Sequence, residues 1–145
     1  MYPEEIVLPM RKQLTDQGFS ELKSVHDVDE MISNEGTTLV VVNSVCGCAA
    51  ANARPGAITS LINDKKRDHL TTAFAGVDRD AVEKVRYYLA PFPPSSPAIA
   101  LFKNGELVHM LERHHIEGRS AEMISQNLKG AYNETANCNN LEYQC

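Results

Sequence analysis

Residues 37–55, TTLVVVNSVCGCAAANARP, predict a buried strand joined to a helix through a pair of cysteines. Residues 37–42 are β-branched apart from Leu39, a pattern typical of a central parallel strand covered on both faces. The alanines from Ala49 onward favour a helix, so the turn must carry Cys46, Gly47 and Cys48. The stretch therefore predicts an α/β fold with two thiols at the start of a helix.

A helix start is a place where a thiol ionises readily. Its unpaired N–H groups carry roughly half a positive charge and can depress a cysteine pKa from about 8.5 toward about 3.5–7.5. We expect Cys46 to lie at the cap and to be the nucleophile, with Cys48 as the resolving or modulating thiol. Positions two apart in a helix face nearly opposite sides, so a Cys46–Cys48 bond requires Cys46 outside the helix and a backbone adjustment at Gly47.

The runs NSVCGCAAANARPG and PPSSPAIALFKNGELVHMLERHHIEGRSAE closely resemble the bacilliredoxins, thioredoxin-like proteins with a Cys-Gly-Cys motif. The resemblance covers nearly the whole chain, from VLPMR to the last helix. It implies a thioredoxin-like three-layer sandwich with a mixed central sheet and an added N-terminal helix. It also implies an enzyme that removes bacillithiol, or a similar low-molecular-weight thiol, from mixed disulfides on protein cysteines. An activity resembling thiol–disulfide isomerisation is attributed to the family as well.

The same resemblance implies partners and a substrate surface. The partners are thiolated proteins, bacillithiol as a co-substrate with no bound cofactor, and a flavin-dependent disulfide reductase that regenerates the thiol. In thioredoxin-like folds a cis proline precedes the strand that faces the reactive cysteine, and Ser96-Pro97 stands in the matching place. We therefore expect Gly47, Ser96 and Pro97 to bind substrate, with the backbone before Pro97 offering hydrogen bonds to an extended chain.

Composition narrows the remaining classes of function. With 145 residues and 43% apolar content, the chain fits one domain, which we place at residues 1–132, followed by a polar tail at 133–145 that we expect to be unstructured. The net charge of −5, from 19 acidic and 14 basic residues, gives no basic excess for a nucleic-acid partner. An acidic start and the absence of a run of about 20 apolar residues predict a cytoplasmic protein with no membrane partner.

Alternative interpretations of the cysteines remain open. Cys46 and Cys48 are too close together to staple much of a fold, and Cys138 and Cys145 lie in the polar tail, so we expect reduced, working thiols and no disulfide framework. The pair together with His114 and His115 could supply four metal ligands, but the spacing is unlike that of structural zinc sites, and we predict no metal. Two inert core cysteines are a further alternative.

Other residues and function classes are also left undecided by the sequence. Arg54 could hold an anionic thiol or be a solvated surface residue. The three histidines His109, His114 and His115 are interpreted as surface or partly buried residues, not as general bases. A generic protein disulfide reductase or isomerase would use the same cysteines, whereas a non-enzymatic interaction domain would keep only the fold.

Periodicity and turn signals predict the order of the other elements. We expect an N-terminal helix from Pro3 to near Gly18, an edge strand in 19–25, helices at 26–34 and 78–89, and strands at 70–77, 98–102 and 106–111. Asn104-Gly105 predicts a tight hairpin that joins the last two strands in antiparallel fashion. The helix after the cysteines should run to about Lys66, bent at Pro55, with Ile58, Leu61 and Ile62 buried, before a charged turn at 64–68. Asp78 or Asp80 should cap one helix, and Ser120 should cap the last, which should end near Ala131 with Met123, Ile124 and Leu128 inward.

Overall fold

The computed structural model describes residues 2–62 and 68–140, and side chains as far as Thr135. Its elements in chain order are α1 (Glu4–Thr15), β1 (Ser20–Glu21), α2 (Val25–Ile32), β2 (Thr37–Asn43), the π-helix η1 (Ala49–Ala53), α3 (Arg54–Ser60), β3 (His69–Phe74), α4 (Arg79–Leu89), β4 (Ala98–Lys103), β5 (Glu106–Leu111), α5 (Arg113–Ile116) and α6 (Ala121–Asn140). No helix in these described ranges is long and apolar enough to span a membrane.

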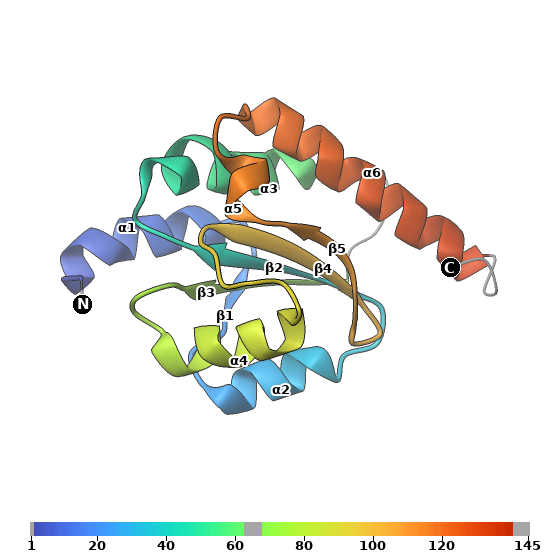
Figure 1. The fold of residues 1–145 in the computed structure, drawn as a ribbon, viewed down its shortest axis with the longest axis horizontal. Helices are drawn as coiled ribbons and strands as arrows, with labels where there is room; N and C mark the ends of the chain where they lie inside the picture. The colour runs from blue at the N-terminus through green and yellow to red at the C-terminus, as the bar shows by residue number, and fades with distance from the viewer. Residues whose placement is uncertain (1, 63–67, 141–145) are drawn as a thin grey trace.

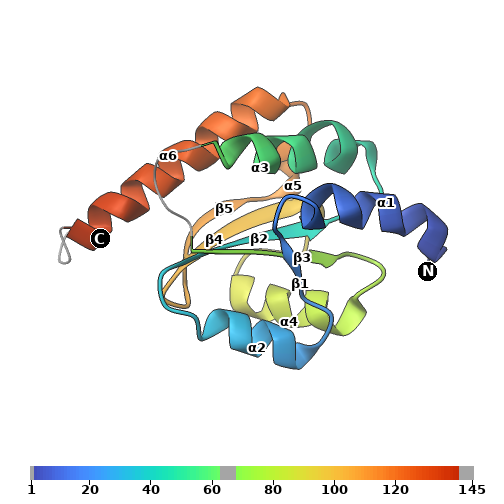
Figure 2. The ribbon, with the colours of Figure 1, turned by 180° about the vertical axis from the view of Figure 1, so that it is seen from behind.

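The described strands form one mixed sheet in the order β1-β3-β2-β4-β5. β1, β3 and β2 run parallel, whereas β4 and β5 are antiparallel to their neighbours. Helices α2 and α4 cover one face, and α1, α3 and α6 cover the other, which gives three layers (Figures 1 and 2). The predicted thioredoxin-like sandwich with a mixed sheet and an added N-terminal helix is confirmed.

β2 lies in the middle of this sheet, and all seven of its residues are buried. Its side chains alternate between two cores, as a strand requires. Leu39 and Val41 belong to the core beneath α3 and α6, and Val40 and Val42 belong to the core beneath α2 and α4. Burial on both faces fixes the position of β2, and with it the turn that follows.

The N-terminal helix is joined to the sheet by a buried ion pair that the sequence did not reveal. The Arg11 guanidinium, 7% exposed, donates to both carboxylate oxygens of Asp78 at 2.8 and 2.9 Å and to Glu21 at 2.7 Å. These hydrogen bonds, that to Asp78 foremost, outweigh burial and raise the pKa of Arg11. Asp78 stands at the expected cap position of α4, but its carboxylate binds Arg11 and the Phe74 N–H rather than that helix.

Several predicted boundaries are wrong. The helix after the cysteines ends at Ser60 and not near Lys66. Its last turn is closed by hydrogen bonds between residues three apart, from the Leu61 N–H to the Ile58 carbonyl and from the Ile62 N–H to the Thr59 carbonyl. Ile62 is 81% exposed rather than buried. Most of the charged turn expected at 64–68 lies outside the described residues. The strand expected at 70–77 ends at 74, and the edge strand expected in 19–25 is only two residues long.

The last helix is longer than predicted and turned differently. Ser120 does cap it, accepting the Met123 N–H at 3.1 Å, and Ile124 and Leu128 are buried, but Met123 is 54% exposed. α6 continues past Ala131 to Asn140, so the expectation of an unstructured tail from Asn133 is wrong for 133–140. The apolar stripe continues through Tyr132, whose hydroxyl shares a hydrogen bond with the Ser60 hydroxyl at 2.8 Å. Cys138 falls within α6, and Cys145 lies outside the described residues.

The predicted hairpin between β4 and β5 is confirmed. Asn104 and Gly105 have φ angles of 51° and 83°, the left-handed values of a tight two-residue turn. This hairpin lies at the end of the sheet where β2 begins, because Thr37 pairs with Lys103. The cysteine turn therefore lies at the opposite end.

Candidate active site

Cys46 and Cys48 lie in the turn that leads from β2 into η1. The Cys46 carbonyl accepts the N–H groups of Ala49 at 3.1 Å and Ala50 at 3.2 Å, the first bonds of the helix. Cys46 is therefore the cap residue, as predicted, while Gly47 and Cys48 form the first turn. Both cysteines are free thiols and partly exposed.

The surroundings of Cys46 favour its thiolate. Burial of the sulfur opposes ionisation, but hydrogen bonds from the Ser44 hydroxyl and from the backbone N–H groups of Ala49 and Cys48 outweigh it. The positive charge of Arg113 acts in the same direction, and the pKa of Cys46 lies below its ordinary value. Cys46 has the properties of a nucleophilic thiol.

Cys48 has the opposite tendency. Burial, a hydrogen bond from its thiol to Glu117 Oε2 at 3.5 Å and the nearby charge of Cys46 raise the pKa of Cys48. The Arg113 guanidinium opposes this shift from 3.8 Å, donating from Nη2 to Cys48 Sγ. Two cysteines two residues apart thus have pKa values displaced in opposite directions, so each is suited to a different step.

Arg113 connects the cysteine turn to the segment before β4. Its Nη1 donates to the Ser96 carbonyl at 3.1 Å, and its backbone N–H donates to the Ser95 hydroxyl at 3.3 Å. The Ser96-Pro97 bond is cis, as the resemblance implied, and Pro97 is buried. A second cis bond, Ala90-Pro91, was not anticipated. The predicted substrate segment and Cys48 therefore both contact one guanidinium.

Arg54 lies beneath the cysteine turn. It is only 3% exposed, so the interpretation as a solvated surface arginine is wrong. Its Nε donates to Gln13 Oε1 at 2.6 Å, and its Nη1 donates to Asn43 Oδ1 and the Ser44 carbonyl, both at 2.8 Å. It forms no ion pair with any residue the structure describes. Burial lowers the pKa of Arg54, and the charge of Cys46 opposes that shift.

The helix that follows the cysteines begins irregularly. Residues 49–53 are π-helical, and Pro55, which lacks a backbone donor, is the second residue after this segment. Such π-helical turns are rare and often accompany functional sites. Gly47 is exposed, and a side chain there would meet no atom within 4 Å. Neither the available space nor the backbone angle requires a glycine at that position. The effect of Gly47 is that no side chain stands over the cysteine turn from this position.

The histidines do not join the cysteines. His115 Nδ1 accepts the Glu112 N–H at 3.0 Å in a capping box, and His109 pairs with Asn127 at 2.6 Å. Across the described part of the chain, the grouping of potential metal ligands is Glu112, His114 and His115, and it contains neither cysteine. The four-ligand set considered from the sequence is not brought together.

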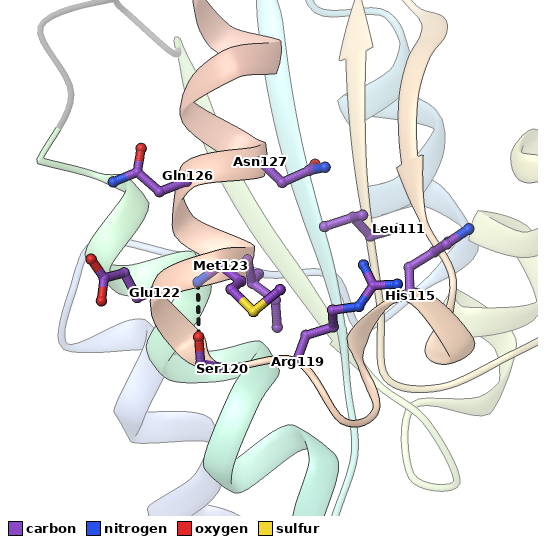
Figure 3. Close-up of a pocket in the computed structure, with 9 residues that line it drawn as sticks. Leu111, His115, Arg119, Ser120, Glu122, Met123, Gln126 and Asn127 are labelled. Atoms are coloured by element: carbon purple, nitrogen blue, oxygen red, sulfur yellow. Dashed lines mark hydrogen bonds between the residues drawn. The ribbon is translucent and has the colours of Figure 1, made fainter.

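A pocket of about 600 Å³ lies between β5, the connection from α5 to α6 and the first turns of α6 (Figure 3). Leu111, Met123 and Ile124 supply apolar walls, and His115 and Arg119 supply polar groups on the side of α5. Neither cysteine lines it. The cysteine turn is therefore a surface site beside this pocket, not inside it.

Comparison with known proteins places this geometry in a family. A family model described as Disulphide isomerase matches residues 2–138. The bacilliredoxin of Cytophaga hutchinsonii is 56% identical over 134 residues, which cover 92% of this chain and 99% of that relative. This chain belongs to the bacilliredoxin family. A Halalkalibacterium halodurans bacilliredoxin is also 56% identical, covering 92% and 93% of the two chains, and one from Bacillus cereus is 50% identical over 139 residues, covering 94% and 95%.

Solved structures agree on the fold. The Trxlp of Edwardsiella tarda EIB202 has a TM-score of 0.55 at 15% identity, covering 74% of this chain and 96% of that one. The thioredoxin of Malassezia sympodialis has a TM-score of 0.54 at 12% identity, covering 82% and 91%. This bacilliredoxin family member, with a pair of free cysteines on a thioredoxin fold, is a thiol–disulfide oxidoreductase.

Sequence reasoning missed three contributors to this bacilliredoxin site. Ser44, Arg113 and Glu117 all act on the cysteines, yet none was singled out. Arg113 and Glu117 both lie in the run ERHHIEG, residues 112–118. An Arg and a Glu four residues apart on a short helix are spaced to pair, and that signal could have drawn attention to them.

Proposed function

We propose that the protein removes bacillithiol, or a similar low-molecular-weight thiol, from mixed disulfides on protein cysteines. The observation that carries the proposal is the difference between the two cysteines: the surroundings of Cys46 lower its pKa, and those of Cys48 raise its pKa. A single activated sulfur at a partly exposed cap is suited to attack a small, exposed disulfide. The similarity to proteins named bacilliredoxins supports the same substrate class.

The chemistry is one thiol–disulfide exchange. The Cys46 thiolate attacks the bacillithiol sulfur of the mixed disulfide, and a new bond forms between Cys46 Sγ and that sulfur. The old bond breaks, its electron pair leaves with the protein sulfur, and that thiolate then takes a proton from water. The substrate protein is reduced, and bacillithiol is carried on Cys46.

Ser96 and Pro97 are proposed to bind the substrate chain around its modified cysteine. Arg113 already occupies the Ser96 carbonyl at 3.1 Å, so an incoming chain must share or displace that contact. Gly47 leaves the approach uncovered. A flavin-dependent disulfide reductase is the proposed partner that returns bacillithiol to its thiol form, and the reducing cytoplasm is the proposed compartment.

The experiment uses a protein whose cysteine carries bacillithiol. Cys46→Ser should abolish the removal of bacillithiol from the substrate cysteine. Cys48→Ser should retain the attack and accumulate bacillithiol on Cys46, as seen by mass spectrometry of the peptides. Cys138→Ser and Cys145→Ser should each leave the rate nearly unchanged, because α6 ends at the opposite end of the sheet from the cysteine turn (Figure 1). An adduct trapped on Cys48 instead would reverse the assignment.

The alternative of a generic reductase or isomerase is favoured by one finding, the description of the matching family model as Disulphide isomerase. It predicts comparable rates on protein disulfides without bacillithiol. Measuring both substrates side by side separates the two. The non-enzymatic alternative predicts a Cys46 pKa near about 8.5, and the hydrogen bonds around Cys46 argue against it.

A further inference from the structure

Glu117 is the acidic side chain that contacts the reactive pair. It caps the end of α5, and its Oε2 lies 3.5 Å from Cys48 Sγ. The same oxygen accepts Nε and Nη2 of Arg113, both at 3.3 Å. The Cys48 sulfur therefore lies between an anion and a cation, and these two groups, with Cys46, are the charges that act on it.

α5 holds this carboxylate in place. Ile116, next to Glu117, is fully buried in the core with Leu111 and Ile124. Glu112 and His115 form a capping box that closes the short helix. Although the Glu117 side chain is 59% exposed, its backbone is fixed beside the cysteine turn.

The sign of the effect follows from charge. A carboxylate that accepts a thiol hydrogen bond stabilises the thiol and repels the thiolate. Arg113 acts in the opposite direction, but its guanidinium also serves Glu117 and the Ser96 carbonyl. Cys46 repels the Cys48 thiolate only while it is itself a thiolate. Once Cys46 carries another thiol, that repulsion is gone, and among the charges of the described residues that act on Cys48, Glu117 is the negative one that remains.

We propose that Glu117 keeps Cys48 protonated and thereby slows the attack of Cys48 on a mixed disulfide at Cys46, which leaves that disulfide to a second thiol from solution. This deepens the proposed function and rests on it for the identity of the thiol. Glu117 thus governs which of two routes restores Cys46.

Both routes balance. In the internal route, Cys48 loses its proton to water and attacks Cys46 Sγ. A Cys46–Cys48 bond forms, and the carried thiol leaves with the electron pair and is protonated. In the external route, a thiolate from solution attacks the carried sulfur, a small disulfide forms, and Cys46 leaves as the thiolate. Only the internal route needs the Cys48 thiolate.

The size of the effect follows from thiol reactivity. Removing one nearby negative charge lowers a pKa by about one unit, which raises the thiolate fraction roughly tenfold at neutral pH. A more acidic thiol is intrinsically less nucleophilic, and this offsets about threefold of that gain in the rate of attack. Glu117→Gln should therefore speed the internal step about threefold.

The test uses 4,4′-dithiodipyridine, a neutral chromogenic disulfide, on the Cys138→Ser/Cys145→Ser chain. A first thiopyridone is released when Cys46 attacks, and a second when Cys48 displaces it, so Cys48→Ser should lose the second phase. In Glu117→Gln the first phase should be nearly unchanged and the second about threefold faster. Glu106→Gln is the matched control, because it removes the same charge from β5 at the far end of the sheet.

Salt separates an electrostatic role from a structural one. High salt should speed the second phase of the unaltered chain toward that of Glu117→Gln, because exposed charges are screened. It should not speed the second phase of the variant, where Arg113 is the remaining charge beside Cys48 and favours its thiolate. A second phase that is absent, unchanged or slower in Glu117→Gln overturns the inference. Because the probe contains no bacillithiol, that outcome leaves the proposed substrate untouched, whereas failure on a bacillithiol-modified protein with a normal first phase would overturn the substrate and spare Glu117.

Discussion

Replacing Arg54 by methionine should alter both the stability of the fold and the acidity of Cys46. The guanidinium is 3% exposed and joins three partners, Gln13 in α1, the Asn43 side chain at the end of β2 and the Ser44 carbonyl. Ser44 in turn accepts the Cys46 N–H at 3.2 Å. Arg54 therefore joins the N-terminal helix to the turn that carries Cys46.

The magnitude follows from what methionine cannot replace. Hydrogen bonds to a charged group contribute about 1.5–3 kcal/mol each, and three are lost, but the variant no longer has to desolvate a cation. We expect a net loss of about 2–4 kcal/mol in the free energy of unfolding. Losing one nearby cation should raise the Cys46 pKa by about one unit and slow its attack at neutral pH about threefold.

The assay is alkylation with iodoacetamide over a range of pH, followed by mass spectrometry of each cysteine peptide, so that Cys46 is measured separately. Urea denaturation gives stability on the same samples. Arg54→Lys keeps the charge without the planar fork, so it should lose stability and largely keep the Cys46 pKa. Arg79→Met, an exposed arginine at the start of α4, is the control for net charge. An unchanged Cys46 pKa in folded Arg54→Met would refute the reasoning.

Three further outcomes follow from the described contacts. Gly56→Ala should lower the free energy of unfolding by about 1–2 kcal/mol, because the added Cβ would stand 2.7 Å from the Ile124 side chain. Gly130→Ala, where the added Cβ would meet open space, should be neutral or stabilising, and chemical denaturation of both variants compares them. Arg11→Met should cost about 3–5 kcal/mol by leaving the buried Asp78 without its cation, seen as a lower melting temperature, and adding Asp78→Asn should recover part of it. Because the Cys46 pKa is lowered by folding, its thiolate adds stability that is fully present above the ordinary thiol pKa and is lost as pH falls through the folded-state value. Urea denaturation of Cys48→Ser should therefore show stability rising across that window, and a rise that persists after Cys46→Ser is added would contradict this.

The elements predicted correctly from the sequence are those determined by residues adjacent along the chain. The β-branched run of β2 followed by alanines determines a strand that leads into a helix, and Asn104-Gly105 determines a tight turn through the φ angles these residues tolerate. Cys46 is the cap for the same local reason. The predictions failed where the local pattern was ambiguous. Met123 and Ile124 are neighbouring apolar residues and both were expected to face inward, but packing against α3 decides that Ile124 is buried and Met123 is exposed.

The electrostatics of the site was decided by tertiary structure alone. Glu117 contacts Cys48 across 69 positions of sequence, Arg113 reaches it across 65, and the buried Arg54 binds Gln13 of α1 across 41. A pKa responds to charges and hydrogen bonds within a few ångströms, whatever their separation along the chain. Local sequence placed two thiols at the start of a helix, and the fold decided which of them has the lower pKa.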